Sequence, residues 1–288
     1  MNIVSGFISN INKRSDRDVT KYINYGLELM SVEIPMTIFI ERELFDVSVL
    51  PVLQKRGISP AAGEGTFTYR VSGGVMDGLQ QTFTYVKMGH IVFIFFRICD
   101  LFLWPYKKMA NKFTLNTNNL NKDTLEYMMV QCQKSEWMAI ASQYIRSTSQ
   151  QNNIEYVWID FGVFHMFQGK IDVFQTELYK MKARVHKRLT GGSSKRVLFA
   201  RCWDPNHAYY GDIYKDINWL FAGSVFGGGE LVINQFALKM REKCLQIMRE
   251  RNTLMWEVNI WVLIYRELPD LFAFYPSDHS EIVFRGYS

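Results

Sequence analysis

The 288-residue chain lacks the motifs that mark several large classes of enzyme and scaffold. Its four cysteines, Cys99, Cys132, Cys202 and Cys244, include no pair at the spacing of a zinc finger. They are typical of reduced core residues, so neither a disulfide scaffold nor a cysteine-based metal site is indicated. The sequence also has no H-E-x-x-H motif and no Ser-His-Asp elbow, which argues against zinc-dependent and serine hydrolases.

A long uninterrupted apolar run is absent as well. The most apolar stretch, 90–104, contains Arg97 and Asp100 and is shorter than the roughly 20 residues that span a bilayer as a helix. The chain enters a strand-like pattern at Asn2, without the basic and apolar regions of a signal peptide. We therefore expect a cytoplasmic protein with no transmembrane segment, and a peripheral contact with an anionic membrane surface stays open.

Charge is sparse and mixed. The 33 Lys and Arg exceed the 28 Asp and Glu by a net +5, and they are scattered apart from 180–188 and 195–196. Nucleic-acid binding would require a continuous basic stripe on a recognisable module, so no nucleic-acid partner is expected. The run at 180–188 fits a solvated helix face, and a mildly basic protein suits an anionic small molecule.

The most informative stretch is 154–162, which reads I-E-Y-V-W-I-D-F-G. Its β-branched and aromatic residues predict a buried strand that ends at Asp160. In open α/β sheets, ligands bind at the carboxyl ends of the strands. Asp160 is therefore a candidate functional residue. The alternative is that its side chain only caps the turn that follows.

The remaining pattern alternates strands and helices, which predicts an α/β fold. We expect a strand at 3–8, a helix near 19–30 that is capped by Asp16 or Asp18, and a strand at 36–40. A long helix should begin after Asp123 or Thr124. Further elements are expected at 196–201 (strand), 231–249 (helix) and 252–267 (helix). We expect one domain over 1–288.

A resemblance to a known family appears in three segments. Tyr156–Gly162, Met1–Glu41 and Gly223–Glu230 resemble the bacterial HtrL/YibB family, whose members look like glycosyltransferases of the GT-A type. The likeness covers most of the chain loosely. It implies a Rossmann-type mixed central sheet flanked by helices, with a nucleotide-binding part at about 1–165 and an acceptor-binding part at about 166–288.

The same resemblance implies which residues bind the donor. In GT-A enzymes a D-x-D motif holds a divalent cation against the diphosphate, but here Phe161 and Gly162 follow Asp160, so the second acid is absent. The loop after the first strand receives the nucleotide, a basic residue neutralises the diphosphate, and a glycine-rich turn approaches the donor sugar. The implied donor contacts are Gly6, Phe7, Arg14, Lys134, Asp160, Phe161, Gly162, Gly227 and Gly228.

The implied activity is transfer of a hexosyl or pentosyl group from a nucleotide-diphosphate sugar, with a UDP-sugar favoured, to a hydroxyl of a glycan or glycoconjugate. Mn²⁺ or Mg²⁺ would be held by Asp160 with Asp278 or His279. The acceptor must lose a proton, so we expect an inverting reaction with Glu257 as the base; a plain helix-face glutamate is the alternative. A non-catalytic nucleotide-sugar-binding module and a sugar nucleotidyltransferase are the competing functions.

Overall fold

The computed structural model describes residues 1–9, 11, 18–61, 63–149, 153–190, 195–207 and 209–287. Its strands are β1 (Asn2–Phe7), β2 (Met36–Ile40), β3 (Gly65–Arg70), β4 (Gln80–Met88), β5 (Ile91–Phe95), β6 (Glu155–Ile159), β7 (Val197–Arg201), β8 (Phe221–Gly229) and β9 (Phe272–Pro276). Within the described residues they form one nine-stranded mixed sheet in the order β3-β4-β5-β2-β1-β6-β8-β7-β9. The predicted α/β class is confirmed.

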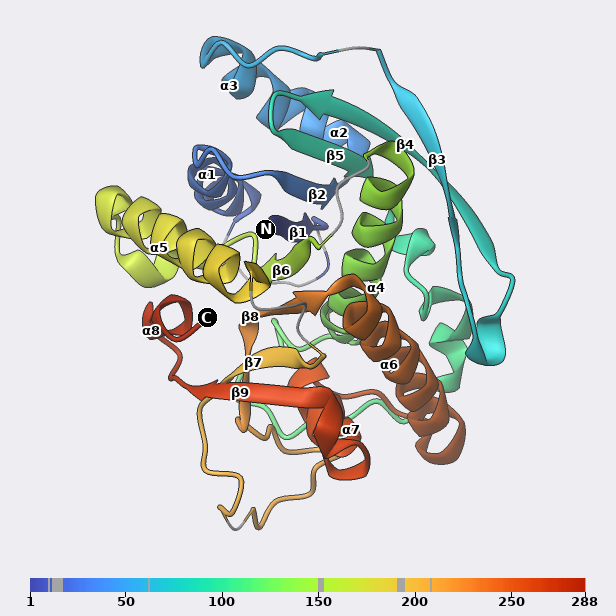
Figure 1. Cartoon of the computed structure of the whole chain (residues 1–288). Helices are drawn as coiled ribbons and strands as arrows, with labels where there is room; N and C mark the ends of the chain where they lie inside the picture. Colours follow the sequence, from blue (N-terminus) through green and yellow to red (C-terminus); the bar gives the residue numbers. More distant parts are fainter. Residues whose placement is uncertain are drawn as a thin grey trace.

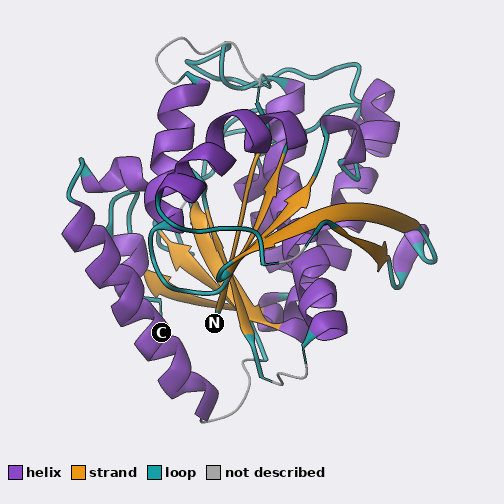
Figure 2. Cartoon of the chain, turned by 90° about the horizontal axis from the view of Figure 1, so that it is seen from above, coloured by secondary structure: helices purple, strands orange, loops and turns teal. Residues whose placement is uncertain are grey.

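Helices cover both faces of this sheet (Figure 2). They are α1 (Val19–Met30), α2 (Arg42–Leu44), α3 (Leu50–Lys55), α4 (Leu125–Thr148), α5 (Ile171–Thr190), α6 (Glu230–Arg251), α7 (Glu257–Glu267) and α8 (Ile282–Arg285). Figure 1 shows α1, α5 and α8 on one face and α4, α6 and α7 on the other. No helix among the described residues combines the length and the apolar character that crossing a membrane requires.

The central strands send alternate side chains into two cores. Val4 and Trp158 belong to the core under α4, α6 and α7, whereas their neighbours Ile3 and Val157 belong to the core under α1, α5 and α8. Every residue of β2 and β6 is buried, as expected for parallel strands covered on both faces. This explains why both strands are mostly apolar, with Thr37 and Glu155 as buried polar exceptions.

The chain reverses its direction of winding at β1. This strand is parallel to β2 on one side and to β6 on the other, with Val4 opposite both Thr37 and Trp158. The connection through α1 leads from β1 to β2, while β6 joins the other side much later in the chain. Such a switch point opens a crevice at the carboxyl ends of the two strands, which are Phe7 and Ile159.

Local sequence signals set the starts of the two helices nearest this crevice. Asp18 caps α1 by accepting a hydrogen bond from Lys21 N at 2.7 Å, and Thr124 caps α4 by accepting one from Tyr127 N at 3.1 Å. Each cap satisfies an amide that has no partner within its helix. The structure thus selects one residue from each of the two predicted pairs of caps.

The tetrapeptide T-F-T-Y occurs at 66–69 and again at 82–85, and its two copies pair with each other. They lie in the antiparallel strands β3 and β4, where Phe67 is opposite Phe83 and Thr68 is opposite Thr82. The two threonine hydroxyls are 3.1 Å apart. The recurrence therefore belongs to one hairpin.

The glycine run at 227–229 forms part of a strand, which corrects the predicted turn. It lies in β8, which is antiparallel to both β6 and β7. A Cβ atom on Gly227 would lie 2.3 Å from the Tyr287 hydroxyl and 2.3 Å from the Tyr156 carbonyl oxygen, and one on Gly228 would lie 2.8 Å from Val232. These glycines are required by packing inside the sheet, so Gly227 and Gly228 do not approach a donor from a loop.

Candidate functional site

A pocket with a volume of about 560 Å³ opens at the carboxyl ends of β1 and β6. This volume falls within the roughly 300–1,000 Å³ typical of small-molecule sites. The first residues of β8, the inner face of α4 and the start of α7 complete its walls. The pocket thus lies at the switch point of the sheet, where the position of Asp160 predicts a ligand site.

Most of the predicted site residues line this pocket, although they come from distant parts of the chain. Asp278, Gly227 and Gly228 are not among the residues that line it, and Arg14 lies outside the described residues. The predicted residues that do line it are Gly6, Phe7, Lys134, Asp160, Phe161, Gly162, Glu257 and His279.

Lys134 joins the two predicted acids at the base of the pocket. Its Nζ lies 3.0 Å from Asp160 Oδ1, 2.9 Å from Glu257 Oε1 and 3.0 Å from the carbonyl oxygen of Gly223. Burial lowers the pKa of Lys134, but the carboxylates of Asp160 and Glu257 outweigh this effect and raise the pKa above its ordinary value. Lys134 is therefore a buried ammonium that connects α4 with β8, α7 and the end of β6.

This arrangement changes the role expected for Lys134. An ammonium group has three N–H donors, and three protein oxygens lie within hydrogen-bond distance of this one. Lys134 can donate to a diphosphate only by releasing Asp160, Glu257 or Gly223. In this state its role is to fix the direction of two carboxylates.

Two glycines make room for the side chains around Lys134. A Cβ atom on Gly223 would lie 2.4 Å from Glu257 Oε1 and 3.4 Å from Lys134 Nζ, so a side chain there would separate the ion pair from β8. A Cβ atom on Gly6 would lie 2.7 Å from the ring of Trp137. Gly6 therefore accommodates the aromatic layer next to the pocket, whereas we expected it to allow close approach of a ligand.

Asp160 presents a partly exposed carboxylate to the pocket. Its Oδ1 accepts hydrogen bonds from Trp158 Nε1 at 2.7 Å and from Lys134, and 38% of its side chain is exposed. Among the described residues, no hydrogen bond to Oδ2 is seen, and none runs from the side chain to the turn at 161–163. Asp160 is thus not a turn cap, and Oδ2 remains for a ligand.

Aromatic rings form the wall of the pocket on the β1 side. The Phe7 ring stacks with Tyr22 at 5.5 Å and with Phe161 at 5.2 Å between ring centres. A Cβ atom on Gly162 would lie 2.7 Å from the Tyr22 ring, so Gly162 lets this wall close. Phe7 and Phe161, two of the donor contacts that the resemblance implies, lie in this wall, and Tyr22 is a third member that the sequence alone did not single out.

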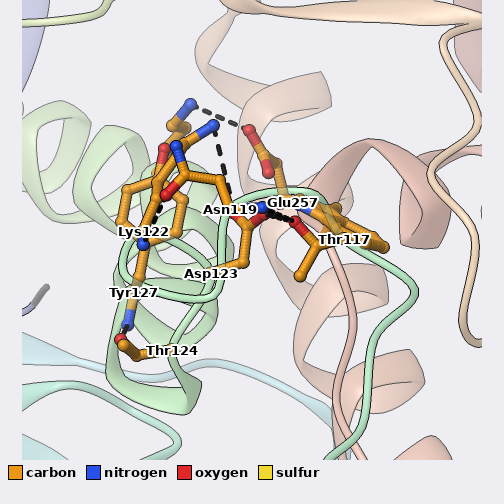
Figure 3. A network of polar contacts seen from close by, with 9 residues as sticks. Thr117, Asn119, Lys122, Asp123, Thr124, Tyr127 and Glu257 are labelled. Atoms are coloured by element: carbon orange, nitrogen blue, oxygen red, sulfur yellow. Dashed lines mark hydrogen bonds and ion pairs between the residues drawn. The ribbon is translucent and has the colours of Figure 1, made fainter. Parts of the chain in front are cut away.

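A second network, shown in Figure 3, fixes the start of α7 beside the pocket. Buried Asp123 accepts hydrogen bonds from the Thr117 hydroxyl and from Trp256 Nε1, the latter at 3.4 Å, and lies 3.9 Å from Lys122 Nζ. Trp256 directly precedes Glu257, the first residue of α7, and makes no capping hydrogen bond through its side chain. Asp123 therefore positions Glu257 through the backbone. No sequence signal indicated this, because Asp123 and Trp256 are 133 residues apart.

The predicted metal ligands near the C-terminus are separated. Asp278 is exposed, and its carboxylate accepts hydrogen bonds from the hydroxyl (2.6 Å) and amide (2.8 Å) of Ser280, which lower its pKa. His279 lines the pocket with its ring 4.4 Å from that of Trp219, and burial lowers its pKa. In the part of the chain that the structure describes, no three His, Cys, Asp or Glu residues are grouped to hold a metal ion. Asp278 therefore lies apart from the pocket that Asp160 and His279 line, and a metal site that includes it stays a prediction.

The charged residues that line the pocket leave it slightly negative. Among the described residues these are Asp18, Asp160 and Glu257 against Lys122 and Lys134, a balance of three acids to two bases. The described lining residues therefore carry a small excess of negative charge.

The sequence matches no model of a protein family, and it matches no curated protein. The relation to the HtrL/YibB family stays a resemblance, which rests on the three segments that surround the pocket.

Proposed function

We propose that this protein is a glycosyltransferase of the GT-A type that moves a sugar from a nucleotide-diphosphate sugar, with a UDP-sugar favoured, to a hydroxyl group of a glycan acceptor. The observation that carries the proposal is the place of Asp160. This partly exposed carboxylate ends a buried parallel strand at a switch point, inside a pocket of about 560 Å³. In the GT-A enzymes that the chain resembles, an acid at such a place organises the diphosphate through a cation.

The aromatic wall supports a nucleotide on the β1 side of Asp160. Phe7 and Tyr22 are both partly exposed and stack with each other, which suits a flat, partly apolar base. A base on this wall directs the diphosphate toward the next strand, β6, and hence toward Asp160. The donor would then lie along the edge of the sheet, with its base at β1 and its diphosphate at β6.

The residues fit a divalent cation that arrives together with the diphosphate. Asp160 Oδ2 offers one oxygen ligand, and the excess of acids among the described lining residues favours a ligand that brings positive charge. Hard cations such as Mg²⁺ accept one or two carboxylates and complete their shell with phosphate oxygens and water. When bound, such a cation would stabilise the negative charge of the leaving diphosphate.

Side chains of the protein orient the carboxylates and accept the proton of the attacking hydroxyl. Lys134 fixes the direction of Asp160 and Glu257, and the network around Asp123 fixes the start of α7. Glu257 Oε1 accepts a hydrogen bond from Lys134. Among the described residues, none is seen to donate to Oε2. Glu257 is our proposed proton acceptor for the attacking hydroxyl.

Calorimetry with UDP, GDP and CDP, each with Mn²⁺ and with EDTA, tests the proposal. We expect one nucleotide to bind with micromolar affinity only when Mn²⁺ is present. The variant Asp160→Asn should weaken this binding at least tenfold, whereas Asp278→Asn, which alters an exposed acid outside the pocket, should leave it unchanged. Absence of binding for all three nucleotides refutes the proposal.

A second assay separates transfer from nucleotidyl chemistry. A glycosyltransferase releases a nucleoside diphosphate from a sugar donor, whereas a nucleotidyltransferase releases pyrophosphate from a nucleoside triphosphate. Release of pyrophosphate without release of nucleoside diphosphate would replace our proposal with the second reaction.

A further inference from the structure

The pocket follows the edge of the sheet on both sides of Asp160. Beyond β6 the neighbouring strands are β8, β7 and β9, in that order. Adjacent strands are about 4.8 Å apart, so the edge from β1 to β9 covers about 19 Å. Phe7 is the last residue of β1, while Trp219 precedes β8 and His279 follows β9. The pocket therefore has two walls, with Asp160 between them.

The wall on the β8 side differs from the donor side in its chemistry. Its described side chains are Ile217, Trp219, Val258 and His279. None of these carries a permanent charge. His279 is an exposed residue, and partial desolvation of its ring lowers its pKa, while Asp278 opposes this effect. The wall suits an uncharged ligand better than a phosphate.

The backbone amides of the residues before and after Trp219 are both hydrogen-bonded. The amide of Asn218 donates to Asn259 Oδ1 at 2.8 Å, and the amide of Leu220 donates to Asn218 Oδ1 at 3.0 Å. Asn259 is completely buried, and the Trp219 ring makes an edge-to-face contact with the ring of His279. A wall that is rigid before binding loses little conformational entropy when a ligand arrives.

We propose that this wall is the acceptor subsite and that it binds an uncharged sugar ring against the indole of Trp219. The proposal rests on the proposed transferase function. Polarised C–H groups of a sugar face complement the negative face of an aromatic ring, and a neutral imidazole offers one donor and one acceptor to hydroxyl groups. In this proposal His279 contacts the acceptor sugar and does not bind the metal ion. A sugar held here has its hydroxyls in the same pocket as Glu257.

Saturation-transfer NMR with a panel of methyl glycosides of neutral hexoses and pentoses, together with neutral disaccharides, tests this subsite. The nucleotide found by calorimetry and Mn²⁺ are kept saturating. We expect at least one glycoside to bind the wild type, with affinity reduced at least tenfold in Trp219→Leu and less than threefold in Trp219→Phe. Trp104→Leu, which changes another half-buried tryptophan that does not line the pocket, should match the wild type. Nucleotide affinity should be the same in all four proteins.

The variant His279→Gln distinguishes a contact with the acceptor sugar from a role as a metal ligand. We expect weaker glycoside binding and an unchanged dissociation constant for Mn²⁺, measured by its electron paramagnetic resonance. An at least tenfold loss of Mn²⁺ affinity would overturn the assignment, as would equal glycoside binding by Trp219→Leu and the wild type. Nucleotide binding with no bound glycoside refutes the subsite alone. Glycoside binding that depends on Trp219 without any nucleotide binding refutes the transferase and leaves a carbohydrate site.

Discussion

Replacing Lys134 by methionine tests the central ion cluster most directly. Methionine fills a similar volume, so the packing of α4 is retained and the ammonium group is lost. Glu257, whose side chain is only 7% exposed, would then keep a carboxylate without its cation. We expect Lys134→Met to lower the free energy of unfolding substantially and to remain folded.

The structure sets the expected size of this loss. Removing one partner of a buried ion pair costs about 3–5 kcal/mol. Glu257 lines a pocket that water can enter, which places the loss near the lower end, at about 3 kcal/mol. The pair with Asp160, whose side chain is 38% exposed, adds at most about 1 kcal/mol because solvent screens it.

Urea unfolding, followed by circular dichroism, measures this loss. With a slope of about 3 kcal/mol per molar urea, the midpoint should fall by roughly 1 M without a change in slope. The double variant Lys134→Met/Glu257→Gln removes both charges and should recover at least half of the loss. A single variant that loses less than about 1 kcal/mol, or a double variant no more stable than the single, would refute the reasoning.

The difference in unfolding free energy between the wild type and Lys134→Met should also depend on pH. The pKa of Lys134 is raised above 10.5 in the folded protein, so its protonated form stabilises the fold. This contribution is complete below pH 10.5 and is lost as the pH rises through the raised pKa. The difference in stability between the wild type and Lys134→Met should therefore be constant near neutral pH and shrink in alkali.

Three further changes separate packing from binding. Gly223→Ala places a Cβ atom 2.4 Å from Glu257 Oε1 and should cost about 1–3 kcal/mol in urea unfolding, together with a loss of transfer. Asp160→Asn keeps an oxygen for its two hydrogen-bond donors, so we expect less than about 1 kcal/mol of destabilisation and abolished transfer; full activity would overturn the site. Gly227→Ala clashes with the Tyr287 hydroxyl at 2.3 Å, and it should lower the thermal midpoint while the remaining folded protein keeps its nucleotide affinity.

The sequence was most informative where local chemistry determines the element. The strand at 36–40 is found as predicted, because five consecutive apolar or β-branched residues suit a strand that is covered on both faces. Asp18 and Thr124 cap their helices because their side-chain oxygens reach free amides one turn ahead. The position of Asp160 followed from the same kind of evidence, since a carboxylate is expensive to bury within a strand and suits its end.

Features that depend on distant residues were missed. Glycine is rare in strands, so a run of three indicates a turn. Here Tyr156 and Tyr287 occupy the space that a side chain at 227 would need, and Val232 occupies the space beside 228. The resemblance implies Lys134 as a donor contact, but no local signal indicates that this lysine is buried on a helix that packs against the sheet and α6. Its partners at 223 and 257 carry no local signal that connects them with it.

The cluster around Lys134 also has a consequence for folding. Its hydrogen bonds join residues separated by 89 positions (Gly223) and 123 positions (Glu257). Contacts this distant form only after long loops close, which is entropically unfavourable and slow. The pocket should therefore be among the last parts of the molecule to assemble, and recovery of nucleotide binding during refolding should lag behind recovery of helical circular dichroism.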